Sequence, residues 1–189
     1  MLKHDVDGAA RAYRDILKSN PKSPAAWAGL AQVELMKGRP GGASQVAEAA
    51  LKLDAGNHDA QIIRAAALIY TDPARALDEF ERLGQRIFSP SVSFGKAWAL
   101  HLTGAAYGKV LQALDECDEW DDQAVAVLRG ESLLAAGKEE KAMTEYLRAL
   151  EFGDEAQSQE RLAELRGEQP PPSSSSSHRA LAEVVWLVR

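Results

Sequence analysis

One cysteine and four histidines are the side chains of this sequence best suited to nucleophilic or metal chemistry. A catalytic thiolate needs a base within reach, and the nearest histidine along the chain to Cys117 is His101, on what we predict to be the preceding helix. The histidines are too dispersed for a metal-binding motif: His4, His58, His101 and His178. A lone cysteine also excludes an intrachain disulfide. We therefore expect no catalytic, cofactor-binding or metal-binding residues, and no enzyme activity.

An acidic cluster surrounds Trp120 and consists of Asp115, Glu116, Asp118, Glu119, Asp121 and Asp122. It could attract a basic partner. Because the cluster lies between two predicted helices, where carboxylates favour the N-terminus of the next helix, we interpret it as a solvated turn. It lacks the central glycine of a calcium-binding loop. Gly41 and Gly42 do not follow a predicted strand, so they do not indicate a phosphate-binding loop.

The composition is that of an ordinary globular protein, with 46% hydrophobic and 26% charged residues. The formal net charge is −6 and the lysines and arginines are scattered, which argues against nucleic acid as a partner because phosphate binding needs a basic surface. No apolar run approaches the roughly 18 residues of a membrane-spanning helix, and no signal peptide begins at Met1. We therefore expect a cytoplasmic protein without a membrane span.

The elements that position these side chains follow from an internal repeat. A first column of small apolar residues recurs at spacings of 34, 33, 34 and 32: Ala9, Ala43, Ala76, Val110 and Ala142. Four residues further on lies a second column: Tyr13, Ala47, Phe80, Leu114 and Tyr146. Three beyond these lies a third: Ile16, Ala50, Leu83, Cys117 and Ala149. Three parallel columns with one period predict stacked helix–turn–helix units, and place Cys117 in a core of small residues.

The unit from Pro24 to Asn57 resembles the tetratricopeptide repeat (TPR) family through Trp27, Leu30 and Ala43, with Pro21 closing the preceding unit. Departures from the family pattern are Ala31, Glu34, Ala47 and Ala55. The last unit matches through Gly130, Gly137, Ala142, Tyr146, Ala149 and Leu150, but carries Arg129 where leucine is usual. The resemblance covers about residues 1–152. It implies an all-α fold, a right-handed TPR-like α-solenoid of stacked antiparallel helix pairs.

We predict helices at 5–18, 24–37, 41–53, 58–70, 73–86, 91–103, 106–118, 123–136 and 139–152. The first unit lacks its first helix. Ser23-Pro24, Asp72-Pro73 and Ser89-Pro90 each pair an N-cap residue with a proline at the first helical position. Residues 153–167 are expected to form a capping helix from Asp154 to Arg166, followed by a Pro/Ser linker over 168–177 and an apolar tail segment over 178–189.

In the TPR family the first helix of each unit lines a concave groove. The resemblance therefore implies a partner groove formed by Ala28, Gln32, Met36, Ile62, Ile63, Ala66, Ile69, Tyr70, Leu128 and Glu131. A mostly apolar groove predicts a protein or peptide partner with apolar anchors. The alternative is that several of these residues only pack against neighbouring helices or the tail. No cation stands at Ala28, Gln32, Ile62 or Ala66, which argues against the family's clamp for chaperone carboxylate tails.

Three hypotheses on function remain open at this level. The first is a non-catalytic scaffold or adaptor. The second is self-assembly as a homo-oligomer, through the open N-terminal repeat edge or through the apolar tail with Val185, Trp186 and Leu187. The tail could also dock on its own groove or on another domain. The third, motivated by a chain that starts inside a repeat, is the regulatory TPR arm of a longer enzyme.

Overall fold

The computed structural model describes residues 5–117, 123–152 and 157–168, which form ten α-helices and no strand. These are α1 (Val6–Ser19), α2 (Pro24–Met36), α3 (Pro40–Leu53), α4 (His58–Leu68), α5 (Pro73–Gly84), α6 (Pro90–Leu102), α7 (Tyr107–Asp115), α8 (Gln123–Ala135), α9 (Glu139–Glu151) and α10 (Gln157–Arg166). Each lies where the repeat predicted a helix. The linker and the apolar tail lie outside the described residues.

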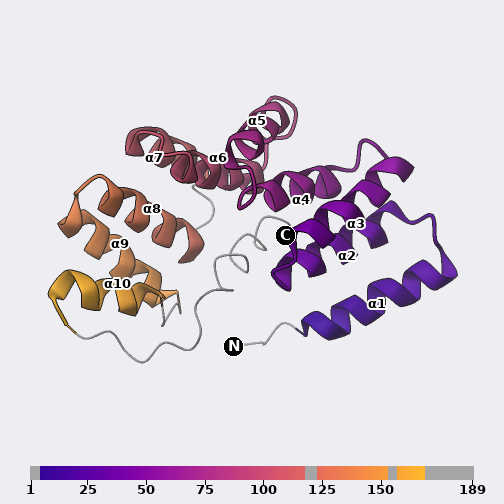
Figure 1. The fold of residues 1–189 in the computed structure, drawn as a ribbon, viewed down its shortest axis with the longest axis horizontal. Helices are drawn as coiled ribbons and strands as arrows, with labels where there is room; N and C mark the ends of the chain where they lie inside the picture. The colour runs from indigo at the N-terminus through magenta and orange to yellow at the C-terminus, as the bar shows by residue number, and fades with distance from the viewer. Residues whose placement is uncertain (1–4, 118–122, 153–156, 169–189) are drawn as a thin grey trace.

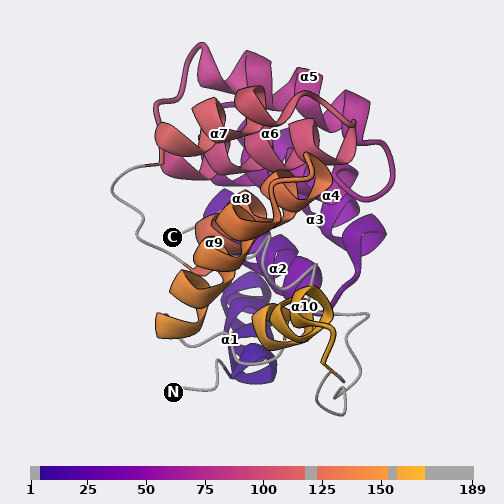
Figure 2. The same cartoon turned by 90° about the vertical axis from the view of Figure 1, so that its left-hand side faces the viewer.

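The helices alternate between two roles. The first helices α2, α4, α6 and α8 each contact the next along the row, whereas the second helices α3, α5, α7 and α9 pack mainly against the first helices on either side. Figure 1 shows the array as an arch that runs from α1 to α10, with α5, α6 and α7 at its top. Seen from one end in Figure 2, α1 and α10 both lie below α5 and α6. The chain therefore forms an all-α, TPR-like solenoid.

Burial separates the two kinds of helix. First helices are buried on several faces, as in α2, where Ala26, Leu30, Val33 and Leu35 lie in the core. A helix that is apolar all round belongs in an interior. Second helices bury one face only. That face is made of the predicted columns: Ala43, Ala47 and Ala50 in α3; Ala76, Phe80 and Leu83 in α5; Ala142, Tyr146 and Ala149 in α9.

The turns inside the units repeat as regularly as the helices. Gly38, Gly104 and Gly137 stand at φ of 70°, 72° and 69°, a left-handed conformation that favours glycine. The three predicted pairs of an N-cap residue and a proline are all present, at Ser23, Asp72 and Ser89. Ser23 accepts from the Ala26 amide at 3.2 Å and Asp72 accepts from the Arg75 amide at 3.1 Å, whereas the Ser89 side chain makes no capping hydrogen bond. There the fixed φ of Pro90 begins the helix without a side-chain cap.

Candidate functional site

The predicted groove is largely core. Six of its ten residues are buried in the described structure: Ala28, Ile62, Ile63, Ala66, Ile69 and Leu128. They belong to one hydrophobic cluster that runs through α2, α4, α6 and α8. A first helix is surrounded by its own partner, the preceding second helix and its neighbours in the row, so positions that face a groove in the family pattern are covered here. The prediction that these six side chains lie open to a partner therefore needs correction.

The other four predicted groove residues are half-buried and do not gather at one place. Gln32 and Met36 lie on α2. The ring of Tyr70 meets the edge of Trp98 with centroids 6.3 Å apart. Glu131 on α8 is engaged by α10, because Arg161 Nε donates to Glu131 Oε1 at 2.8 Å and Nη2 donates to Oε2 at 3.2 Å. This pairing raises the pKa of the Arg161 guanidinium. Glu131 therefore joins α8 to α10 within the chain.

A cleft of about 470 Å³ opens at the beginning of the array, and we call it the first-unit cleft. Its lining residues come from α1, the α1–α2 turn, α2 and the start of α4: Tyr13, Ile16, Ser23, Ala25, Ala26, Ala28, Gly29, Gln32 and Asp59. Ala28 and Gln32 are the two predicted groove residues that reach it. The lining combines apolar side chains with polar groups, namely the Gln32 amide, the Asp59 carboxylate, the Tyr13 hydroxyl and the capping hydroxyl of Ser23.

One wall of the first-unit cleft is an apolar helix face that is covered in every other unit. The third column is buried at Ala50, Leu83, Cys117 and Ala149, but Ile16 on α1 is 45% exposed. Tyr13 of the second column is likewise only half-buried, although Phe80 and Tyr146 are fully buried. Only Ala10 of α1 is buried. Among the described residues, the apolar face of α1 is therefore less covered than the equivalent faces of the other second helices.

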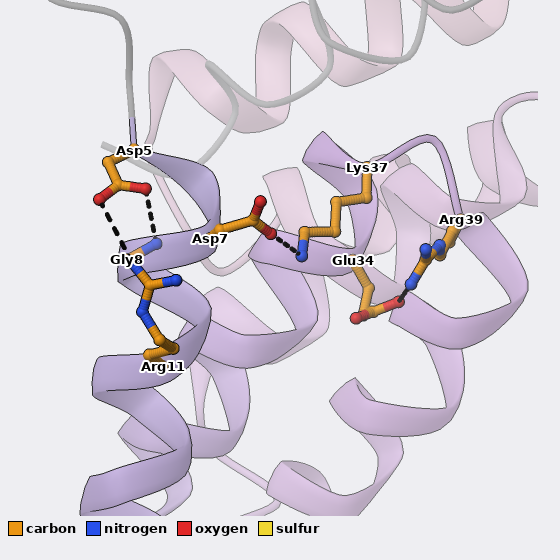
Figure 3. A network of polar contacts seen from close by, with 7 residues as sticks. All are labelled: Asp5, Asp7, Gly8, Arg11, Glu34, Lys37 and Arg39. Atoms are coloured by element: carbon orange, nitrogen blue, oxygen red, sulfur yellow. Dashed lines mark hydrogen bonds and ion pairs between the residues drawn. The ribbon is translucent and has the colours of Figure 1, made fainter.

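An ion pair joins the N-terminal end of α1 to the end of α2 (Figure 3). Asp5 caps the helix by accepting from the Gly8 amide at 2.7 Å. Lys37, at the end of α2, donates to Asp7 Oδ1 at 2.6 Å, and this bond lowers the pKa of the Asp7 carboxyl. Asp7 lies outside the cleft lining, so these contacts position α1 without filling the cleft.

Two further clefts lie away from the first unit. One, of about 470 Å³, includes Val92, Lys96, Glu116 and Phe88, whose side chain is 99% exposed. Sequence reasoning missed Phe88. The sequence does contain a signal for it, which is a pair of large apolar residues, Ile87 and Phe88, in a turn between units. The equivalent turns, 20–23 and 54–57, consist mostly of polar or small residues.

The other cleft, of about 440 Å³, lies among α7, α8 and α9. Lys138 lies over the Tyr107 ring with its Nζ 4.4 Å from the centroid, and Arg129 donates to Asp115 at 2.8 Å. Burial raises the pKa of the Glu145 carboxyl on the same lining. The two described members of the acidic cluster are thus both engaged within the chain, because Glu116 also accepts from the Ser93 hydroxyl at 3.1 Å. Its members 118–122 lie outside the described residues.

The groups with possible reactivity have structural partners. Cys117 is buried, as predicted, with its thiol donating to the Pro90 and Ala113 carbonyls at 3.6 and 3.7 Å. The hydroxyl of Ser132 lies 3.1 Å from His101 Nδ1, but Ser132 is buried and joins α8 to α6. Burial also lowers the pKa of the His101 imidazole. Over residues 5–117, 123–152 and 157–168, no three acidic, histidine or cysteine side chains are placed to hold a metal. No helix in these ranges has the length and apolarity needed to cross a membrane.

Comparison with known proteins agrees with this architecture. Residues 3–58 match the family model described as tetratricopeptide repeat. The chain is similar to a tetratricopeptide repeat protein from Parabacteroides merdae (TM-score 0.66, 14% identity, covering 96% of this chain and 65% of that one). It is also similar to PilF of Pseudomonas aeruginosa (0.62, 19%, covering 97% and 82%). A third similar structure is YrrB, described as a TPR protein with an unusual peptide-binding site (0.54, 18%, covering 82% and 81%). No curated protein matches the sequence.

At these identities the solved structures establish the fold alone, which is that of a TPR solenoid. The resemblance to the TPR family, predicted from Trp27, Leu30 and the columns, is confirmed by the family model over the first units and by the shared architecture over most of the chain.

Proposed function

We propose that this protein is a non-catalytic interaction scaffold that binds an apolar helix or peptide of another protein in the first-unit cleft. The observation that carries the proposal is the half-open face of α1, where Ile16 is exposed although its counterparts in the other units are buried. An exposed apolar face beside a cleft is typical of an interaction surface. A TPR protein described as having a peptide-binding site, YrrB, supports the same class of function for this fold.

The lining favours a helical segment with apolar anchors at successive turns. Ala25 offers a small, exposed side chain to a partner, whereas Ala28 is buried and the ring of Tyr13 covers Gly29. Tyr13 and Ile16 offer large apolar surfaces on the facing wall. Burying apolar area contributes about 25 cal/mol per Å², from which the cost of ordering the partner is subtracted. The few polar groups of the lining would set the orientation of the bound segment.

A matched pair of substitutions tests the site. Ala25 and Ala74 are both exposed and both directly follow the proline that begins their helix, but only Ala25 lines the cleft. A glutamate at either position is compatible with a helix N-terminus. Peptides selected from a random library on the full chain, measured by fluorescence anisotropy, should bind Ala25→Glu at least about tenfold more weakly, a loss of about 1.4 kcal/mol. Ala74→Glu should bind them as the wild type does.

The reason for the expected loss is desolvation, because a carboxylate in the cleft must either lose water or exclude the apolar anchor. Both variants should keep the wild-type melting temperature, which separates lost binding from lost folding. Equal peptide affinities for Ala25→Glu and the wild type would reject the first-unit cleft as the binding site.

A further inference from the structure

Among the described helices, the first-unit cleft lies beside α1, the one second helix with extensive contacts on one side alone. Among the described helices, α3 packs against α2 and α4, α5 against α4 and α6, α7 against α6 and α8, and α9 against α8 and α10. Each of these second helices thus lies between two others. By contrast, α1 makes extensive contact with α2 alone. The geometry of the array therefore leaves room beside α1 and α2 for one helix in the position of a first helix.

The properties of the first helices define what would fit there. They are 11 to 13 residues long in α2, α4, α6 and α8, and they carry apolar residues on several faces because they are enclosed by neighbours. Second helices are different, with one apolar and one polar face. The occupant should therefore be a short helix that is apolar nearly all round, and not a conventional amphipathic helix.

We infer that the occupant is the C-terminal segment of this chain, residues 178–189, bound in the first-unit cleft in the position of a first helix. The segment reads HRALAEVVWLVR and has 12 residues, the length of a first helix. Leu181, Val185 and Val188 recur at helical spacing, while Trp186 and Leu187 extend the apolar surface to other faces. Its charges stand mainly at the two ends, as expected for a helix enclosed along its middle.

The linker that carries this segment starts at the opposite end of the array from α1. The described chain ends at Glu168, just after α10, and α10 and α1 are the two ends of the arch, facing each other across its open side (Figures 1 and 2). Residues 168–177 form a ten-residue linker, which spans roughly 33–36 Å when fully extended. A short flexible tether holds a ligand at an effective concentration on the order of millimolar, so even a weak site would be occupied by its own tail.

This inference rests on the proposed function, because it assigns the same cleft an internal ligand. The tail would then compete with an external helix, and the apparent affinity for that helix would fall in proportion to the fraction of free cleft. Binding of a partner would release the segment from α1. The protein would thereby regulate access to its own binding site.

Cross-linking in the full chain tests where the segment lies. Val185→Cys is combined with Ile16→Cys in one protein and with Leu53→Cys in the other, and each is treated with a short bis-maleimide at low concentration. Ile16 and Leu53 are 45% and 43% exposed, so the two acceptor sites are matched in accessibility, and native Cys117 is buried. Intact-mass measurement should show an intrachain cross-link to Ile16→Cys and none to Leu53→Cys. Interchain products with Ile16→Cys would show that a second copy fills the cleft, and would overturn the inference, as would equal cross-linking at both sites or none.

A competition measurement gives a second readout. Val185→Glu places a charge on the apolar surface of the tail and should raise the affinity of the full chain for a selected peptide by about tenfold. Ser175→Glu, which adds the same charge to the linker, should leave that affinity unchanged. Unchanged affinity in Val185→Glu would overturn the inference. A wrong proposed function would give a different result. In that case Ala25→Glu would leave the affinity for the selected peptide unchanged, whether or not Val185→Glu alters it.

Discussion

Replacing Gly95 with alanine is expected to destabilise the protein by about 1–3 kcal/mol, the usual effect of overpacking a core. In most helix interiors the same replacement stabilises by up to about 1 kcal/mol, because glycine is a poor helix former. Here a Cβ on Gly95 would overlap the ring of Phe80, which is fully buried. Chemical denaturation of the wild type and Gly95→Ala measures the difference.

Two variants show whether the ring contact is the cause. Gly108→Ala on α7 has no atom within 4 Å of the added carbon and should not destabilise the protein. Phe80→Leu removes the ring, so Gly95→Ala should cost much less in that background than in the wild type. Equal costs in both backgrounds would contradict the proposed clash.

Removing the guanidinium of Arg161 is the second change with a large expected effect. Arg161→Ala removes the guanidinium that makes a bidentate pair with the Glu131 carboxylate. The Glu131 side chain is only 19% exposed. Breaking a fully buried ion pair costs about 3–5 kcal/mol, and exposed pairs contribute about 0–1 kcal/mol. Arg161 is 38% exposed, so we expect about 1–3 kcal/mol. The loss should appear as faster amide exchange in α10, which this pair joins to α8.

The control is an ion pair of similar length in an exposed setting. Lys18 Nζ lies 2.7 Å from Asp15 Oδ1 with both side chains mostly exposed, so Lys18→Ala should leave the stability unchanged. A second variant, Glu131→Gln in the Arg161→Ala background, removes the stranded charge and should recover part of the loss. If Arg161→Ala exchanges like the wild type in α10, the ion pair does not hold that helix in place.

The sequence was sufficient to predict the fold because the repeat constrains it many times over. The second helices α3, α5 and α9 bury the same three column positions, so Ala43, Ala76 and Ala142 each indicate the same packing. Turn glycines such as Gly38 mark the boundaries independently. A weak signal in one unit is therefore compensated by the others.

The site could be predicted only in part, because exposure depends on what neighbouring helices cover. Ile63 and Ile69 occupy inward positions in the family pattern, but they are enclosed by adjacent helices and belong to the core. Glu131 faces α10, where it pairs with Arg161. The residue pattern of α8 gives no indication of this partner, which lies 30 residues later in the chain. The cleft itself depends on the small residues of α2, whose packing only the structure shows.

Hydrogen exchange of the Val185→Glu chain, whose tail should leave the cleft free, tests most directly where this protein binds its partner when measured with and without a saturating selected peptide. We expect the peptide to slow exchange in α1, α2 and the first turn of α4, which together line the first-unit cleft. Exchange in α5, α6 and α7 should be unchanged. Protection confined to the cleft beside Phe88, with none in α1 and α2, would rule out the first-unit cleft as the binding site. The site would then lie at the α5–α6 turn.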